Sequence, residues 1–123
     1  MNLSRWKLAL LAACAASFFS GMSLAQKADE AFSPTVGQAG KDVVWVPTPP
    51  ALVETMLDMA KVTPKDFVMD LGSGDGRTVI TAAKRGISAM GIEYDWKMVD
   101  LSRRNAEKEG VADRARFVMQ DLF

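Results

Sequence analysis

The chain has 123 residues with 15 basic and 15 acidic side chains, so it has room for no more than one domain and carries no formal net charge. Nucleic acids and anionic membrane surfaces attract an excess of basic side chains, so neither is expected as a partner. Cys14 is the only cysteine, which excludes a disulfide framework. The composition favours a small molecule or another protein as the partner.

Residues 1–25 have the three parts of a secretory signal peptide. A basic start at Arg5 and Lys7 precedes an apolar stretch and a small-x-small ending before Gln26. The apolar stretch has about 12 residues, fewer than the roughly 20 of a membrane-spanning helix. We therefore expect a cleaved signal peptide, no stable membrane span after cleavage, and export to the periplasm of a bacterium or beyond it. Lipoprotein attachment at Cys14 is an alternative.

Residues 26–42 are polar, small and unperiodic, which predicts a flexible leader ahead of a domain at 43–123. The first predicted helix of that domain runs from about 50 to 61, because apolar residues recur there at helical spacing. Thr48 is its predicted cap, and Pro50 suits its first turn.

From residue 66 onward, short apolar segments alternate with amphipathic ones. The strands are predicted at 67–71, 87–92 and 116–119, and the helices at 77–85 and 95–109. The first strand is a continuous apolar run broken only by Asp70, as in a strand buried on both faces. This alternation implies right-handed crossovers and a parallel sheet. The predicted fold class is α/β, of the Rossmann-like type.

Three strands are fewer than a doubly wound sheet needs, because its ligand crevice lies where the strand order reverses, beside the first strand. That strand would keep an unpaired apolar edge. We therefore expect the N-terminal half of such a fold, in a chain that is incomplete at its C-terminus. An oligomer that pairs these edges and a small stand-alone half-domain are the alternatives.

Three glycines on alternate positions, Gly72, Gly74 and Gly76, directly follow the first strand. This spacing predicts a tight loop that approaches a ligand closely, at a helix N-terminus that favours an anion. A P-loop is excluded because its GxxxxGK spacing and its lysine are absent. A dinucleotide loop would need its third glycine at Arg77, which disfavours a nicotinamide or flavin dinucleotide.

Three carboxylates stand at the ends of the three predicted strands. Asp70 would repel a pyrophosphate but attract an ammonium or sulfonium. Glu93 lies 17 residues after Gly76, where a carboxylate can accept both hydroxyls of a ribose. Asp121 could accept from the exocyclic amine of a base, or could instead cap a following turn. S-adenosylmethionine, a zwitterionic amino acid joined to a nucleoside, satisfies all three.

The series Asp70-x-Gly72-x-Gly74-x-Gly76, Glu93 and Asp121 resembles the cofactor half of the class I S-adenosylmethionine-dependent methyltransferases. Within that superfamily, the segments VPTPPALVETML and DLGSGDGRTVITAAKRG are similar to the ATP synthase c-subunit lysine N-methyltransferase family and its bacterial relatives. The resemblance covers about residues 43–123.

The resemblance implies an enzyme that transfers a methyl group directly from S-adenosylmethionine to a protein lysine or a small molecule. It implies a set of cofactor-binding residues: Asp70, Gly72, Ser73, Gly74, Gly76, Glu93, Asp121 and Leu122. Among these, Glu93 would hold the ribose, Asp121 the adenine amine, and the Leu122 backbone N–H would lie near the ring. No metal is expected, and no catalytic residue can be named, because substrate-facing residues of the superfamily usually follow a fourth strand. A non-catalytic secreted module that kept this shape for protein contact is the alternative.

Two aromatic residues have two interpretations each. Trp45 could belong to the core or pack over the cofactor, and Trp96 could flank the adenine or be an exposed residue of a helix's first turn. Arg77 and Asp95 are expected to serve the starts of their helices.

Overall fold

The computed structural model describes residues 31–123, so the predicted signal peptide and the first part of the leader lie outside the described residues. The elements follow in the order α2 (Pro50–Met59), β1 (Phe67–Leu71), α3 (Arg77–Lys84), β2 (Ser88–Glu93), α4 (Trp96–Lys108) and β3 (Ala115–Met119). Each predicted helix and strand is present, with ends that differ from the prediction by at most two residues.

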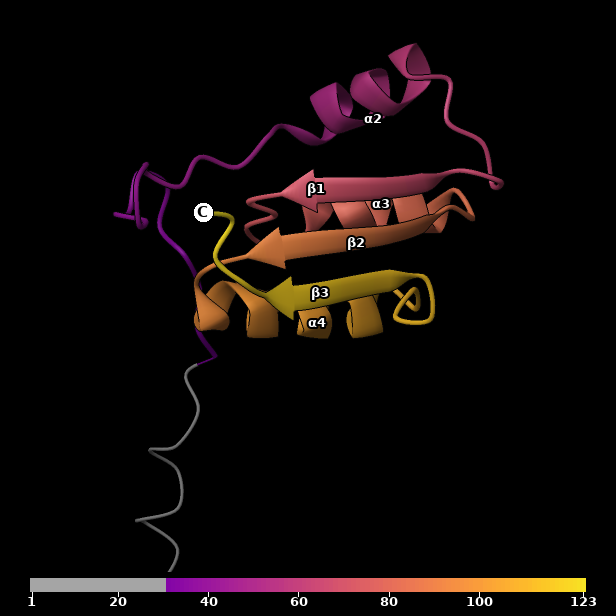
Figure 1. Cartoon of the computed structure of the whole chain (residues 1–123). Helices are drawn as coiled ribbons and strands as arrows, with labels where there is room; N and C mark the ends of the chain where they lie inside the picture. The colour runs from indigo at the N-terminus through magenta and orange to yellow at the C-terminus, as the bar shows by residue number, and fades with distance from the viewer. Residues whose placement is uncertain (1–30) are drawn as a thin grey trace, which may run out of the picture. The chain divides into compact units, whose positions relative to one another are not determined.

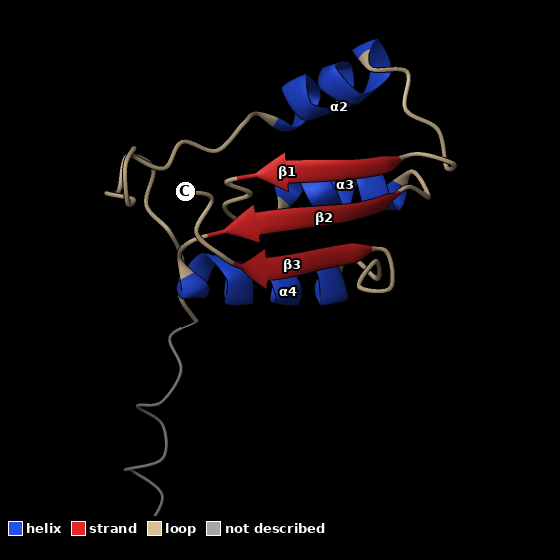
Figure 2. Cartoon of the chain, viewed as in Figure 1, coloured by secondary structure: helices blue, strands red, loops and turns tan. Residues whose placement is uncertain are grey.

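The three strands form one parallel sheet in the order β1-β2-β3, which confirms the predicted α/β class. Figure 1 shows α3 and α4 on the same face of this sheet, and α2 beyond β1. Helix α2 packs against α3. Figure 2 shows that all three strands point the same way, so their carboxyl ends share one edge of the sheet.

The core lies between the sheet and helices α3 and α4, and it extends to the contact of α2 with α3. Small residues allow the close approach: Ala82 and Ala83 on α3, Ala106 on α4 and Ala89 on β2 are all buried. The larger side chains of the core cluster are Val53, Leu57, Val79, Ile80, Ile87, Val99, Val111 and Phe117. This apolar layer fixes where the carboxyl ends of the strands lie relative to the helix N-termini.

The prediction that β1 is buried on both faces is wrong. Its residues alternate between exposed and half-buried, and Phe67, Met69 and Leu71 are 52–59% exposed. The reason is that α3 and α4 cover one face of the sheet only, and none of the helices within residues 31–123 packs on the other (Figure 1). As expected, β1 is an edge strand among the described strands.

The predicted cap of α2 is also wrong, because the N-cap is Pro49 and no side chain caps the helix. Thr48 has a different partner: its carbonyl oxygen accepts a hydrogen bond of 2.8 Å from Arg77. The end of the predicted leader takes part in a small antiparallel hairpin, residues 37–45, closed by a bridge between Ala39 and Val44. We call this segment the 37–45 hairpin. Within the described part of the chain, no helix has the length and apolar character of a membrane span.

Candidate ligand-binding site

A cavity of about 490 Å³ opens at the carboxyl edge of the sheet. Its walls come from the ends of β1 and β2, the segment after β3, and the 37–45 hairpin. Four of the predicted site residues line it together: Gly72, Glu93, Asp121 and Leu122. The volume is in the range of small-molecule and cofactor sites.

The other four predicted site residues are not among the residues that line the cavity. Asp70 is half-buried near the end of β1, whereas Ser73, Gly74 and Gly76 are buried. Gly76 is the N-cap residue of α3, and the Ser73 hydroxyl is buried without a hydrogen-bond partner. The structure therefore places part of the predicted set at the cavity and part in the loop behind it.

The glycine loop is as tight as its sequence predicts. Gly72, Gly74 and Gly76 have φ angles of 82°, 54° and 83°, in the left-handed region that favours glycine. The backbone N–H groups of Gly72 and Ser73 both donate to the Ile92 carbonyl, at 2.8 and 3.0 Å. These bonds fold the loop back onto β2.

Close packing also requires glycine at two of these positions. A Cβ atom at Gly74 would lie 2.7 Å from Trp45 Nε1, and one at Gly76 would lie 2.7 Å from Phe117 Cζ. Trp45 is half-buried and lines the cavity, so it contacts both the loop and the open space. Trp96 is 62% exposed and is not among the lining residues, whereas its neighbour Tyr94 is.

Glu93 is held in one orientation by three backbone N–H groups. Its Oε2 accepts from Gly74 at 2.9 Å, and its Oε1 accepts from Tyr94 at 2.9 Å and from Asp95 at 3.0 Å. One carboxylate thus ties the glycine loop to the end of β2. A carboxylate has about four acceptor positions, so it can accept further hydrogen bonds from a ligand.

Helix α4 supports the loop from behind through two polar side chains. The Ser102 hydroxyl is fully buried and lies 2.8 Å from the Gly74 carbonyl oxygen, and Asn105 donates to the Asp75 carbonyl at 3.1 Å. Sequence reasoning missed both contacts. A serine at an apolar-periodic position of a helix was the available signal, because a buried hydroxyl needs a partner.

Asp95 serves the start of its helix, as expected, whereas the Arg77 side chain makes no cap at the start of α3. The Arg77 guanidinium pairs with Asp75 at 2.6 Å and donates to the Thr48 carbonyl, which links α3 to the segment before α2. Asp95 caps α4 by accepting from the Lys97 backbone N–H at 2.9 Å. Asp95 also lines the cavity.

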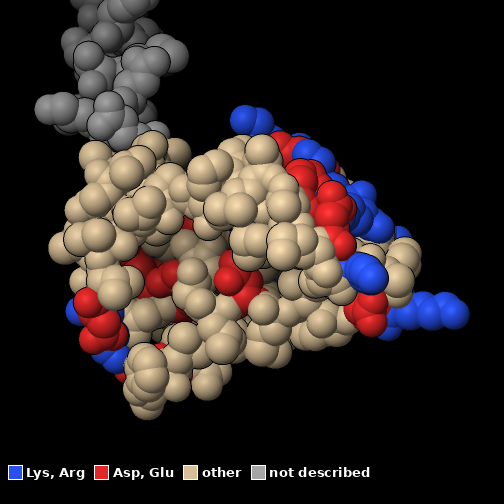
Figure 3. Space-filling model, turned by 90° about the horizontal axis from the view of Figure 1, so that it is seen from above, with Lys and Arg blue, Asp and Glu red and all other residues tan. Residues whose placement is uncertain are grey.

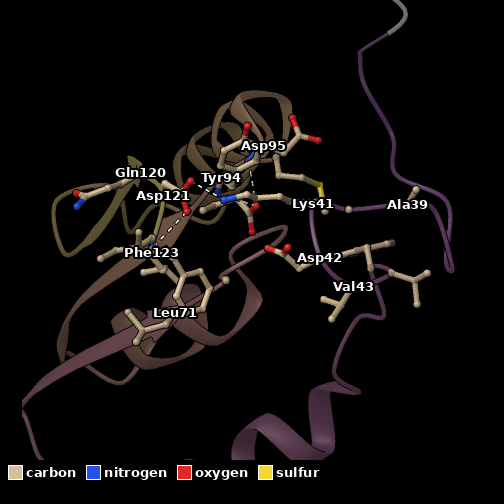
Figure 4. Close-up of a pocket in the computed structure, with 18 of the residues that line it drawn as sticks. Ala39, Lys41, Asp42, Val43, Leu71, Tyr94, Asp95, Gln120, Asp121 and Phe123 are labelled. Atoms are coloured by element: carbon tan, nitrogen blue, oxygen red, sulfur yellow. Dashed lines mark hydrogen bonds and ion pairs between the residues drawn. The ribbon is translucent and has the colours of Figure 1, made fainter.

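Asp121 is engaged by a residue far away in the sequence. Its Oδ2 lies 2.5 Å from Lys41 Nζ, and its Oδ1 accepts from the Phe123 backbone N–H at 3.2 Å. Figure 4 shows the Lys41 side chain reaching Asp121 alongside Tyr94, whose ring centroid is 4.8 Å from the Lys41 nitrogen. Hydrogen bonding to Lys41 lowers the pKa of Asp121, and Asp121 raises that of Lys41. Sequence reasoning missed both Lys41 and Tyr94.

The cavity is acidic. Four of its lining residues carry carboxylates (Asp42, Glu93, Asp95 and Asp121), and Lys41 is its basic lining residue. Figure 3 shows acidic side chains in a hollow bordered by uncharged residues, with basic side chains toward the edges of the view. Residues 31–123 contain no cluster of acidic, histidine and cysteine side chains that could hold a metal ion. This electrostatic environment suits a ligand with positive charge.

Asp70 carries a carboxylate that is costly to ionise in the folded protein. Burial raises its pKa, hydrogen bonding to Thr78 opposes the shift, and the charge of Glu93 adds to it. A carboxyl group whose pKa is raised in the folded state stabilises the fold at pH values below its unfolded-state pKa of about 3.9. This stabilisation is lost as the pH rises through the folded-state pKa. At neutral pH, ionised Asp70 therefore opposes folding.

The Asp70→Asn variant is accordingly expected to be more stable than the wild type at about pH 7, with the difference shrinking toward pH 4. Urea unfolding at both pH values measures it. Asp66→Asn is a control of opposite sign, because hydrogen bonds from Thr63 lower the pKa of Asp66, so its removal is expected to destabilise the protein at neutral pH. A lower unfolding midpoint for Asp70→Asn at neutral pH would contradict the argument.

Comparison with known proteins shows that this chain is similar to methyltransferases. Residues 70–123 match the family model described as the ANTKMT methyltransferase domain. The chain is 45% identical over 83 residues to a protein-lysine N-methyltransferase of Saccharolobus islandicus, covering 66% of this chain and 52% of the relative. It is 42% identical over 79 residues to the ATP synthase c-subunit lysine N-methyltransferase of Xenopus laevis, covering 64% and 34%. The chain thus spans about half the length of the first relative and about a third of the length of the second.

Several solved structures of similar fold hold S-adenosyl-L-homocysteine. One is an RNA methyltransferase from Salinibacter ruber, with a TM-score of 0.61 and 48% identity over 63% of this chain and 52% of that one. Another is an S-adenosylmethionine-dependent methyltransferase from Geobacter sulfurreducens, with a TM-score of 0.55 and 34% identity over 59% and 30%.

Proposed function

Since the chain is similar to S-adenosylmethionine-dependent methyltransferases, we propose that its acidic cavity binds S-adenosylmethionine for methyl transfer. The observation that carries the proposal is the shared cavity: Glu93 and Asp121, from the ends of two neighbouring strands, line it together with Gly72 of the glycine loop. The ligand carries an ammonium, a sulfonium and a carboxylate, so its net positive charge suits this acidic environment.

The proposed roles follow the positions along the sheet edge. Glu93 accepts from the ribose through the acceptor position that its three N–H donors leave, and those donors fix its orientation. Asp121 accepts from the adenine amine, and the Leu122 backbone N–H lies near the ring. The loop of Gly72, Ser73, Gly74 and Gly76 holds the methionine part, with Asp70 toward its amino group.

Bound S-adenosylmethionine supplies an electrophilic methyl group on its sulfonium. The contribution of this chain is alignment, because a nucleophile, a methyl carbon and a leaving sulfur must lie in line for the transfer. The loop and Glu93 are rigidly connected, through the Gly74 to Glu93 bond and the Ser102 support behind it. No protein nucleophile is required.

We propose a protein lysine as the methyl acceptor. Support comes from the names of the relatives from Saccharolobus islandicus and Xenopus laevis, both lysine N-methyltransferases. The similar protein from Salinibacter ruber is an RNA methyltransferase, which makes RNA the competing acceptor. The balance of 15 basic and 15 acidic residues favours protein over RNA. The alternative of a non-catalytic module finds no support among these relatives.

Calorimetric titration of S-adenosylhomocysteine into the full chain tests the binding proposal. We expect saturable binding of one molecule per chain, and no saturable binding of NAD⁺, because Arg77 stands where a dinucleotide loop needs glycine. Saturable binding of NAD⁺ without binding of S-adenosylhomocysteine would contradict the proposal that S-adenosylmethionine is the ligand.

A second experiment identifies the acceptor. The chain is incubated with S-adenosylmethionine labelled on the methyl group and with either a lysine-rich protein or RNA, and the products are hydrolysed. Label in methylated lysine is expected. Label in RNA alone would contradict the lysine proposal, and label in neither acceptor, with the cofactor bound, would indicate a binding module instead of an enzyme.

A further inference from the structure

Lys41 is bonded to Asp121, the residue that is proposed to accept from the ligand's base. Its Nζ is 2.5 Å from Asp121 Oδ2, and the other oxygen of Asp121 already accepts from the Phe123 backbone N–H. Each oxygen of Asp121, the proposed adenine acceptor, therefore already accepts one hydrogen bond from the chain, and a ligand amine would compete with Lys41 for acceptor positions on this carboxylate. The Lys41 nitrogen also lies 4.8 Å from the ring centroid of Tyr94, the aromatic residue that lines this part of the cavity (Figure 4).

The 37–45 hairpin that carries Lys41 is bonded mainly to itself. Its backbone hydrogen bonds run from Gly37 to Trp45, from Trp45 to Gln38 and from Gly40 to Val43, at 2.8–3.0 Å. Among the hydrogen bonds of residues 31–123, the Lys41 to Asp121 bond alone links this hairpin to residues 46–123. The Trp45 ring adds an apolar contact against Gly74.

The bond between Lys41 and Asp121 is easily exchanged. The two side chains are 36% and 42% exposed, and ion pairs at such exposure contribute little net stability and are screened by salt. An amine of a bound base could replace the ammonium as the donor to Asp121 without loss of the hairpin's own hydrogen bonds.

We propose that Lys41 is a built-in competitor for the adenine subsite: its ammonium donates to Asp121 before the ligand binds, and the exocyclic amine of the incoming ligand displaces it. The proposal rests on the proposed function and adds to it a residue that sets ligand affinity. The competition has two consequences. Ligand association requires release of Lys41, and added salt assists that release.

The test compares Lys41→Met, which keeps most of the stem and removes the charge, with the wild-type full chain. The ligands are S-adenosylhomocysteine, which has no net charge, and its analogue with an unsubstituted purine in place of adenine, which lacks the exocyclic amine. Lys84→Met is the matched control, because Lys84 forms a similarly exposed ion pair with Glu109 at 2.6 Å and does not line the cavity.

We expect Lys41→Met to bind S-adenosylhomocysteine about threefold to fivefold more tightly than the wild type. An exposed ion pair is worth about this much, and the variant no longer has to break one when the ligand binds. The gain lies in the association rate, and it is absent for the purine analogue and for Lys84→Met. Moderate salt should increase the association rate of the wild type and leave that of Lys41→Met unchanged.

Weaker binding and faster ligand release in Lys41→Met would overturn the proposal, since Lys41 would then hold the hairpin closed over the ligand. Unchanged binding would also overturn it, as would an equal gain for the purine analogue. If neither the wild type nor Lys41→Met binds S-adenosylhomocysteine while circular dichroism shows both folded, the proposed function itself fails, and the competition fails with it.

Discussion

Glu93→Ala is expected to weaken the binding of S-adenosylhomocysteine by about 100-fold or more. The change removes the acceptor for the ribose, and a hydrogen bond to a charged group is worth about 1.5–3 kcal/mol. It also releases the Gly74 N–H, which loses its 2.9 Å bond to Glu93 and with it the link between the glycine loop and β2. Calorimetric titration measures the loss.

Glu93→Gln separates these contributions. The amide keeps one acceptor oxygen but places an NH₂ group toward N–H donors, so we expect an intermediate loss of affinity, between the wild type and Glu93→Ala. Glu107→Ala, an exposed acidic residue on α4 outside the cavity lining, serves as the control and should bind as the wild type does. Wild-type affinity in a folded Glu93→Ala protein would contradict the role of Glu93.

Gly76→Ala is expected to destabilise the fold by about 2–5 kcal/mol, the sum of left-handed backbone strain and overpacking. The φ angle of Gly76 is 83°, and an added Cβ would lie 2.7 Å from Phe117 Cζ and 2.9 Å from Ser102 Cβ. Phe117 is a buried core residue and cannot move aside without disturbing β3. Urea unfolding of the two proteins gives the difference in the free energy of unfolding.

Gly110→Ala is the matched control for backbone strain. Gly110 has a φ of 70°, and nothing lies within 4 Å of its added Cβ, so only the strain of about 1–2 kcal/mol is expected. The excess loss in Gly76→Ala then measures packing between the loop, α4 and β3. Equal losses at the two glycines would show that the close contacts relax without cost.

The open face of β1 shows where a local pattern misleads. Phe67, Met69 and Leu71 form the apolar run of a strand buried on both faces, yet all three are more than half exposed. A strand's sequence reports which faces are apolar, whereas burial depends on which elements pack against it. The apolar pattern therefore indicated the strand but not its surroundings, and its edge position followed from the number of predicted strands.

The kind and order of the helices and strands, the parallel sheet, and the glycine loop between β1 and α3 could be predicted from the residues alone. Periodicity and glycine spacing are local signals. Which predicted residues share a cavity, and that Lys41 and Tyr94 join Asp121 there, became visible in the folded chain. Lys41 and Asp121 are 80 positions apart. Their contact depends on where the 37–45 hairpin lies against the carboxyl edge of the sheet, and no local pattern of residues records that placement.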